Sequence, residues 1–319
     1  MLPSRQKGSE AFAKFFSEFG QARIVVTSHR KTDVDGLACA FALHKILLNS
    51  IIATDELDDS AKQLAEKLGI KTVLISSLNK KEFAGLVVVD TASYTLLEPA
   101  KEWNILLVID HHHPEGRDMK AGAFIIDEHS PSTAEIVAGL VPEVSKDVAF
   151  ALAAAIISDT ARFKSSTADT FATLADLMKK SEANYKELLD IAEPELRSDV
   201  KVAILKAFQR LSFSYVGDLV IATSEVGANE SDAAQLISEA ADVAFVASWK
   251  DRERETRISA RARKSVPIAL NEVMKEVGES LGGAGGGHPK AAGASVKVHT
   301  AEALRACVDA FSARLIVRE

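Results

Sequence analysis

Several short apolar runs of this chain end abruptly in an aspartate or a histidine, and this pattern restricts the possible folds most strongly. The clearest run covers residues 105–109 and leads directly into Asp-His-His-His at 110–113. Two earlier runs end in the same way, just before Asp90 and just before His29. Continuous apolar runs of this length are typical of strands buried on both faces of a parallel sheet. Polar residues at their ends are then expected at the edge where open α/β sheets bind ligands.

The first half of the chain alternates between such strands and helical patterns, which predicts a doubly wound, mostly parallel α/β sheet. The expected strands are residues 23–28, 51–54, 71–75, 86–89, 105–109 and 123–126. Helical apolar periods predominate from residue 132 onwards. We therefore predict a first α/β domain over residues 1–185, followed by a charged helical connector over residues 186–211.

The remaining residues, 212–319, are predicted to form a smaller α/β domain. Its expected strands are residues 219–223, 243–249, 257–263 and 294–298, and its expected helices are residues 233–240, 266–281 and 301–315. The segment 257–263 alternates strictly, with Arg257, Arg261 and Arg263 on one face and apolar residues on the other. This alternation predicts a half-buried strand with a basic outer face.

The composition excludes several classes of function. No apolar run approaches the roughly 20 residues of a membrane span, and the first residues lack the apolar core of a signal peptide, so we expect a cytoplasmic protein. A net charge of −7 and an aromatic content of 6% argue against a protein that coats long nucleic acid. A short nucleotide in a local basic pocket remains compatible with them. Cys39 and Cys307 are two isolated cysteines, which excludes a disulfide framework or a Cys-x-x-Cys zinc site.

Carboxylates and imidazoles that follow different strands can converge, because the carboxyl ends of parallel strands share one sheet edge. The side chains in question are His29, Asp33, Asp35, Asp90, Asp110, His111, His112 and Asp159. Taken singly, Asp33 could be a helix N-cap, Asp90 a turn residue and the histidine run a surface turn. Taken together they indicate divalent metal ions, because four or five crowded carboxylates repel one another unless cations neutralise them. Two ions about 3.5–4 Å apart clamp a phosphoryl group and lower the pKa of a bridging water.

The glycine-rich run at 282–288 has two interpretations. It lacks the preceding strand of a dinucleotide-binding fingerprint and the Gly-Lys-Ser/Thr of a P-loop. A flexible linker is the simpler interpretation. The alternative is a pocket in which backbone N–H groups, His288 and Lys290 bind a phosphate or carboxylate, together with the basic face of 257–263.

These motifs, in this order, resemble the DHH phosphoesterase superfamily with a DHH-associated domain at the C-terminus. The first motif is His-Arg-Lys-Thr-Asp-Val-Asp-Gly at 29–36, and the second contains Asp90. Asp-His-His at 110–112 is the motif that gives the superfamily its name. Asp159 resembles the fourth motif, and Gly-Gly-Gly-His with Ala-Ala-Gly at 285–293 resembles the C-terminal signature. One departure is Thr32, where many members carry proline or alanine, and we expect only a local effect on the loop.

The resemblance implies a two-manganese phosphoesterase. The implied ligands are His29 and Asp33 for one ion, Asp35, His111 and Asp159 for the other, and Asp90 as the bridge between them. Asp110 would orient an imidazole, and His112 would face the substrate phosphate, so that His112, Asp90 and His111 form the implied catalytic set. His113 lies outside the motif and has no implied role.

The resemblance also implies substrate-binding positions in the second domain. These are Arg261, Gly286, Gly287 and His288. In the first domain, Arg162 and the pair Ser132-Thr133 are weaker candidates for phosphate contacts.

Within the superfamily, the compact two-domain nanoRNase/pAp phosphatase group is the most similar. This resemblance implies manganese-dependent hydrolysis of very short oligonucleotides or of 3′,5′-bisphosphorylated adenosine. The alternative activities are hydrolysis of cyclic dinucleotides and a RecJ-like single-strand exonuclease. A non-catalytic nucleotide-binding protein is the alternative from outside the enzymes, although the metal-ligand set is complete. A homodimer is a further expectation.

Overall fold

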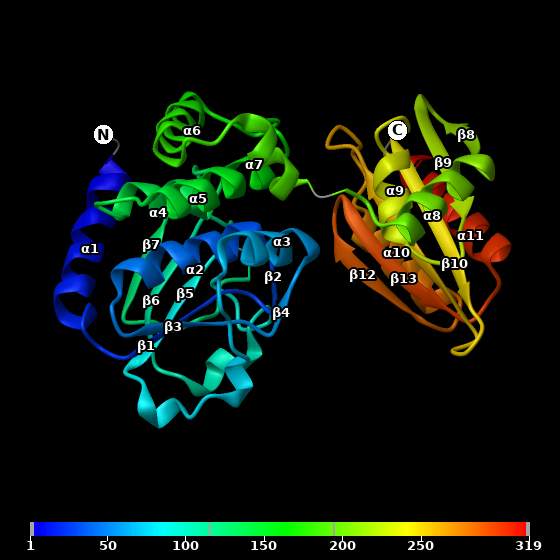
Figure 1. Ribbon diagram of the computed structural model, residues 1–319. Helices are drawn as coiled ribbons and strands as arrows, with labels where there is room; N and C mark the ends of the chain where they lie inside the picture. The colour runs from blue at the N-terminus through cyan, green and yellow to red at the C-terminus, as the bar shows by residue number, and fades with distance from the viewer. Residues whose placement is uncertain (1–2, 115, 194, 317–319) are drawn as a thin grey trace. The chain divides into compact units, whose positions relative to one another are not determined.

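The computed structural model describes residues 3–114, 116–193 and 195–316 of the chain (Figure 1). It divides into two compact units, Met1–Glu195 and Leu196–Glu319. Among the described residues, no helix is long and apolar enough to cross a membrane.

A five-stranded, all-parallel sheet forms the centre of the first unit, as the apolar runs predict. Its strands, in spatial order, are β3 (Ser50–Ala53), β1 (Ile24–Thr27), β5 (Gly85–Val89), β6 (Ile105–Asp110) and β7 (Ala123–Ile126). The chain leaves β1 first towards β3 on one side and later reaches β5 on the other. Such a reversal of strand order is the place where open α/β sheets bind ligands. A separate two-stranded sheet joins β2 (Lys31–Thr32) to β4 (Glu56–Leu57).

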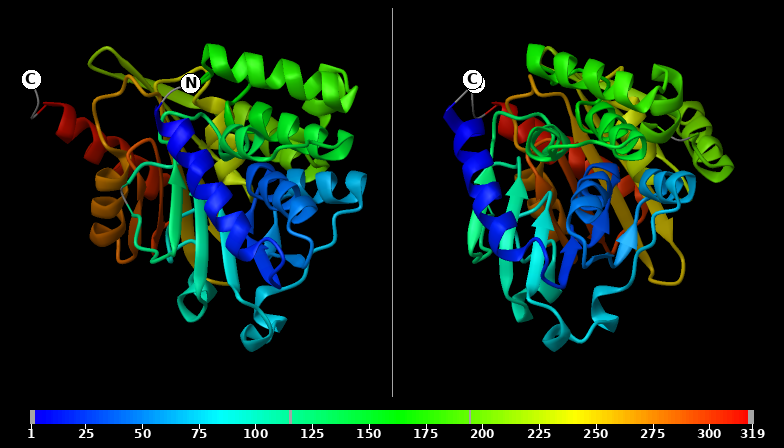
Figure 2. Two further views of the ribbon diagram at one scale, coloured as in Figure 1. Left: turned by 90° about the vertical axis from the view of Figure 1, so that its left-hand side faces the viewer. Right: turned by 60° about the vertical axis from the view of Figure 1, so that its left-hand side comes forward.

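The two faces of this sheet are covered differently. The helices of the unit are α1 (Pro3–Phe19), α2 (Val34–Ile46), α3 (Asp59–Leu68), α4 (Thr133–Leu140), α5 (Lys146–Asp159), α6 (Ala168–Ser181) and α7 (Tyr185–Ala192). They share one hydrophobic core with one face of the sheet, and α1 packs beside β7 and α4 (Figure 2). The other face is covered by the 3-10 turns Ile75–Ser77, Lys80–Glu82 and Glu98–Glu102.

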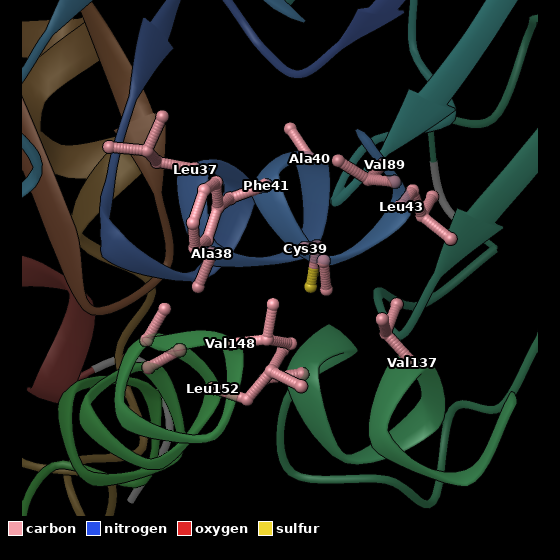
Figure 3. Close-up of a cluster of buried hydrophobic side chains, with 14 of the residues drawn as sticks. Leu37, Ala38, Cys39, Ala40, Phe41, Leu43, Val89, Val137, Val148 and Leu152 are labelled. Atoms are coloured by element: carbon pink, nitrogen blue, oxygen red, sulfur yellow. The ribbon is translucent and has the colours of Figure 1, made fainter. Parts of the chain in front are cut away.

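The centre of the helical layer is the contact of α2 with α5. Figure 3 shows Ala38 and Cys39 of α2 directed towards Val148 and Leu152 of α5. Small side chains on both helices permit this close approach, and all four residues are buried. The buried α2 holds its first turn, with Asp33 and Asp35, in a fixed position at the end of β1.

The expected strand at residues 71–75 is wrong. Only Val73 forms a bridge, to Ala53, and residue 75 already begins a 3-10 turn. The segment lacks the buried environment that its apolar residues suggest, because Lys71, Val73 and Leu74 are at least partly exposed.

The second unit is built on a six-stranded mixed sheet. Its spatial order is β12 (Ala284–His288), β13 (Ala291–Val296), β11 (Glu255–Ala262), β10 (Val243–Lys250), β9 (Leu219–Glu225) and β8 (Ser212–Val216). Only β9 and β10 are parallel to each other; the other neighbours are antiparallel. One face packs on α10 (Leu270–Ser280) and α11 (Thr300–Ile316), the other on α8 (Ser198–Gln209) and α9 (Glu230–Ile237).

The segment 186–211, for which we predicted a connector, is helical at both ends. Its first part belongs to α7, which contacts α3 and α5 of the first unit. Its second part is α8, which contacts α9 and β9 of the second unit.

The glycine-rich run forms the edge strand β12, which is neither a linker nor a loop. A Cβ atom on Gly285 would lie 1.9 Å from the carbonyl oxygen of Met274 in α10, and one on Gly283 would lie 1.8 Å from that of Ser295. Glycine is therefore required here because a helix backbone and a strand backbone approach closely.

Candidate metal centre

Asp33 and Asp35 lie at the start of α2, immediately after β1. Asp33 is the N-cap of α2, and its Oδ1 accepts the backbone N–H of Gly36 at 3.0 Å. His29 Nε2 lies 3.7 Å from Asp33 Oδ1 and 3.3 Å from Asp90 Oδ2. The N-cap role that we considered for Asp33 is therefore present, and its carboxylate also contacts His29.

Asp35 is buried, and its carboxylate is held by the N-terminus of α4. Its Oδ2 accepts the N–H of Thr133 at 2.8 Å, and its Oδ1 accepts the N–H of Ala134 at 2.9 Å. The positive end of the α4 dipole stabilises this negative charge. The contact joins the end of β1 to a helix about 100 residues later in the chain.

Asp90 ends β5 with a positive backbone φ of 61°, a conformation that is uncommon for a residue other than glycine. Its Oδ1 accepts the hydroxyl of Thr133 at 2.9 Å and lies 3.7 Å from His111 Nε2. Asp90 therefore lies between His29 on one side and His111 on the other. Backbone strain of this kind persists where surrounding contacts fix the residue, and it is frequent at functional sites.

The orientation of His111 is fixed by a backbone carbonyl. Its Nδ1 lies 3.1 Å from Ser130 O, which can only accept a proton, so Nδ1 carries the hydrogen. Its Nε2 faces Asp159 Oδ2 at 3.2 Å. A ring that donates from one nitrogen to a carbonyl and presents the other is the usual arrangement of a metal-binding histidine.

Asp110 orients a different ring, that of His112. Its Oδ1 accepts from His112 Nδ1 at 2.8 Å and from the backbone N–H of His111 at 2.9 Å. The side chain of His112 is half-exposed, and its contact with Asp110 leaves Nε2 as the second nitrogen of the ring. His113 is 84% exposed, and its Nδ1 lies 3.7 Å from Glu128 Oε2.

The structure brings together all six residues for which the resemblance implies metal binding. Three groups of ligand atoms each lie within 4.8 Å: His29, Asp33 and Asp90; Asp35, His111 and Asp159; and Asp90, His111 and His112. The first two groups have the composition that the resemblance implies for each ion, and Asp90 links them through its contacts to both histidines. Mixed imidazole and carboxylate ligands suit divalent transition metals, so the residues fit a two-ion centre.

The raised pKa values of the buried carboxylates also favour bound cations at this site. Burial raises the pKa of Asp35 well above its usual value, and the carboxylates of Asp159, Asp90 and Asp33 raise it further. Burial likewise raises the pKa of Asp90, despite the opposing hydrogen bond of His29. Without cations, this cluster resists carrying its full negative charge.

The pKa values of two histidines, His29 and His111, are also raised, which favours their positively charged form. Burial disfavours their charged form, but neighbouring carboxylates outweigh it and raise the pKa of His29 to about 10 and that of His111 to about 9. In the metal-free protein these imidazolium groups therefore provide the positive charge that the carboxylates require.

Comparison with known proteins agrees with this geometry. Residues 23–158 match the DHH family, N-terminal domain, and residues 218–315 match the DHHA1 domain. An uncharacterized protein of Methanocaldococcus jannaschii is 31% identical over 288 residues, which cover 85% of this chain and 86% of that protein. The chain belongs to the DHH family. Members of this family are metal-dependent phosphoesterases, and so is this chain.

Two solved structures share the fold of this DHH protein. An exopolyphosphatase-related protein from Bacteroides fragilis has a TM-score of 0.78 at 16% identity, with 98% of each chain covered. A putative family II inorganic pyrophosphatase from Methanococcus jannaschii has a TM-score of 0.50 at 17% identity, covering 90% of this chain and 99% of that one. At these identities the likeness concerns the fold.

In the DHHA1 domain, the residues predicted to bind substrate occupy neighbouring strands. Arg261 and His288 are both register partners of Ala291, across β11, β13 and β12. Register partners in antiparallel strands point to the same face, so the two side chains stand on either side of one methyl group. Two strand spacings place their Cα atoms about 10 Å apart.

The glycines of this domain differ in what they provide. A Cβ atom on Gly286 would meet nothing within 4 Å, so this position is open. Gly287 has a φ of 132°, and a Cβ there would lie 2.7 Å from the backbone of Ala292. Glycine is therefore required at 287 by the backbone, whereas at 286 it leaves accessible main chain.

The remaining candidates of the DHH domain make contacts of their own. Arg162 follows α5 in a run of three residues with positive φ, and it forms an ion pair with Glu193. Thr133, which the sequence suggested for phosphate binding, directs both its hydroxyl and its N–H to Asp90 and Asp35. Ser130 orients His111 through its carbonyl, a role that no side-chain pattern could reveal.

Proposed function

We propose that this DHH phosphoesterase hydrolyses very short oligonucleotides, or 3′,5′-bisphosphorylated adenosine, with two manganese ions. The observation that carries the proposal is the convergence of four carboxylates and two imidazoles at the carboxyl ends of β1, β5 and β6. A centre of this composition attracts a phosphoryl group only when cations are bound, since its own charge is negative. Nitrogen and oxygen ligands also accept cobalt, iron or zinc, so the choice of manganese rests on the resemblance.

Each ligand has a defined place in the proposal. His29 and Asp33 would hold one ion, Asp35, His111 and Asp159 the other, and Asp90 both. Bound there, two divalent ions would neutralise the phosphoryl oxygens and lower the pKa of the attacking water. Thr133 and Ser130 keep Asp90 and His111 in place during this chemistry.

His112 is suited to protonate the leaving oxygen. The hydrogen bond that His112 donates to the Asp110 carboxylate raises the pKa of His112, which favours the imidazolium form. Its Nδ1 is bonded to Asp110, which leaves Nε2–H free to donate. The attacking water gives up one proton to solvent and bonds through its oxygen to phosphorus, the ester P–O bond breaks, and the leaving oxygen takes the Nε2 proton of His112.

Arg261 and His288 would bind the rest of the substrate. Arg261 is held by Ser231 at 2.7 Å and Gln235 at 3.3 Å, so its guanidinium is preorganised. The net charge of −7 and the aromatic content of 6% favour a short substrate over a long strand. A nucleotide that carries a second phosphate would fit the two hydrogen-bond donors, Arg261 and His288, that flank Ala291.

A substrate panel with the purified chain in manganese tests this proposal. We expect the highest kcat/KM for di- and trinucleotides or for the bisphosphorylated nucleotide. A kcat/KM that rises with strand length would instead support a RecJ-like exonuclease, and preference for cyclic di-AMP a cyclic dinucleotide phosphodiesterase. Binding of these nucleotides without turnover would support a non-catalytic role.

A pair of variants tests the substrate-binding part. Arg261→Gln should raise KM about 10-fold or more, since an arginine–phosphate contact is lost. Arg257→Gln is the matched control. Arg257 lies in the same strand as Arg261 but near the opposite end of that strand, where it donates a hydrogen bond to Glu255. Equal kinetics of the two variants would contradict the role of Arg261.

A further inference from the structure

Among the residues that the structure describes, no strand pairs with the outer edge of the second sheet. β8 is the last strand of that sheet, and residues 208–215 are all exposed. Its sequence, Ser-Phe-Ser-Tyr-Val, contains neither a charge nor a proline. Phe213 is 63% and Tyr215 is 70% exposed. Natural edge strands usually carry lysine, proline or a bulge, because an apolar edge pairs readily with another strand.

Backbone groups of Phe213 and Tyr215 point outward along this edge. Val216 and Leu219 close a hairpin around a two-residue turn and form its first hydrogen-bonded pair. Hydrogen-bonded and non-hydrogen-bonded pairs then alternate along the two strands. Val220, the register partner of Tyr215, donates its N–H to the carboxylate of Asp242 and accepts the backbone N–H of Asp242 at its C=O, both on the β10 side. The backbone of Tyr215 is therefore turned away from β9, towards the open edge.

The two aromatic side chains extend an apolar surface of α8. Phe213 is the register partner of Ala222, which packs on Ala207 of α8, so both aromatic rings lie on the α8 face of the sheet. Their ring centroids are 6.3 Å apart. Leu205 and Phe208 of α8 are also exposed, at 68% and 43%. Contiguous apolar patches of this kind mark interaction surfaces.

The edge is complementary to itself. In an antiparallel pairing of two copies centred on Ser214, Phe213 lies opposite Tyr215 of the second copy, and Tyr215 opposite its Phe213. Arg210 precedes the strand and Asp218 lies in the hairpin turn that follows it, so the same register brings the Arg210 end of each copy to the Asp218 end of the other. All five residues of β8 are then paired, and the outward backbone groups of 213 and 215 meet in hydrogen-bonded pairs. Such a two-fold contact uses the same patch on both copies.

We propose that a second copy of this chain binds at β8, so that the sheets of two DHHA1 domains join edge to edge about Ser214. The complementary charges at 210 and 218 favour this register over a shift in either direction, which would move them farther apart. Two-fold symmetry also places the exposed side chains of both α8 helices on the same face of the joined sheet.

Charge reversal tests the register directly. Arg210→Asp and Asp218→Arg each bring like charges together at the ends of the paired strands, and we expect each to raise the dimer dissociation constant about 10-fold or more. The double variant restores opposite charges and should return the constant to within about 3-fold of the original. The dissociation constants come from sedimentation velocity over a dilution series of the full chain.

Tyr215→Lys is a second, independent disruption, because lysine on an edge strand prevents pairing. Lys206→Ala, on the exposed side of α8, is its control for a charge change outside the strand. Circular dichroism checks that each variant is folded. A wild-type chain that stays monomeric up to about 100 μM, well above the dissociation constants of stable dimers, overturns the proposal. So does a dimer that neither Tyr215→Lys nor the single reversals weaken, since its interface would then lie elsewhere.

Discussion

The hydroxyl of Thr133 donates a hydrogen bond of 2.9 Å to Asp90 Oδ1, and both residues are buried. The same threonine gives its backbone N–H to Asp35. One residue at the N-terminus of α4 therefore positions two carboxylates that lie on different segments of the chain. In the proposed centre Asp35 binds one ion and Asp90 binds both, so Thr133 helps to set the separation of a ligand of one ion from the ligand that the two ions share.

Replacing this hydroxyl should weaken the centre without removing a ligand. Thr133→Val keeps the side-chain shape and the N–H bond to Asp35 but removes the hydrogen bond to Asp90. Loss of such a contact costs about 10- to 100-fold in metal affinity or activity. Thr133→Ser retains the hydroxyl and is the control. Manganese titration calorimetry and kcat measure the effect. Equal metal affinity and kcat in the valine variant would show that the bond does not matter.

The pair Asp110–His112 should control the alkaline limb of the pH–rate profile. Asp110 raises the pKa of His112, so Asp110→Asn lowers it and the protonated donor is lost at a lower pH. The profile of kcat against pH should therefore shift its falling limb to lower pH. An unshifted limb in the variant would exclude His112 as the proton donor.

Metal binding should release protons. His29, with a pKa of about 10, and His111, with a pKa of about 9, are protonated near neutral pH without metal. Only neutral imidazole binds a metal, so about two protons should leave on loading, and apparent affinity should rise with pH. Calorimetry near pH 7.5 in buffers of different ionisation enthalpy counts these protons. A buffer-independent binding enthalpy would contradict the assignment.

The same pKa values set the stability of the metal-free chain. Both exceed the 6.5 of an ordinary histidine, so the imidazolium groups stabilise the folded state fully below about pH 6.5. This contribution is lost as the pH rises through about 9 and 10. Thermal unfolding with chelator should therefore show a melting temperature that falls over this range more steeply than in the metal-loaded chain. Parallel curves with and without metal would contradict this.

Gly36 should be required for the first turn of α2. A Cβ atom there would lie 2.2 Å from Ser28 Oγ and 2.8 Å from Ser28 Cβ. Gly36→Ala should therefore destabilise the chain by about 1–3 kcal/mol and displace Asp35. Gly139→Ala, in α4 with nothing within 4 Å, is the control, and it should be neutral or stabilising by up to about 1 kcal/mol. Chemical denaturation compares the two, and equal stabilities would refute the close-packing argument.

The residues that could be predicted from sequence are those whose position follows from local pattern. Asp90 and Asp110 stand at the ends of continuous apolar runs, and such runs predict buried strands with their polar ends at one sheet edge. The resemblance assigned roles to the side chains that the sheet then brings together. The prediction of a strand at 71–75 was wrong because the apolar residues of this segment are partly exposed, and a local sequence pattern does not reveal exposure.

Contacts between distant segments were beyond such reasoning. Thr133 and Ser130 act through a hydroxyl and a carbonyl that meet Asp90 and His111 only in the folded chain. The glycine run became β12 because α10 packs against it, a relationship that composition alone does not contain. β8 was missed because both of its faces are exposed, so it lacks the apolar period of a buried strand.

The central claim is that Asp90 joins two metal sites in a phosphoesterase. Asp90→Asn tests it most directly, because asparagine tolerates the positive φ of this position but lacks the carboxylate charge. The measurement is kcat on a dinucleotide in manganese, beside manganese stoichiometry by calorimetry. We expect kcat to fall at least about 1000-fold, as for loss of a main electrostatic contributor, with fewer than two ions bound and a folded chain. Full activity with two ions bound would contradict the account.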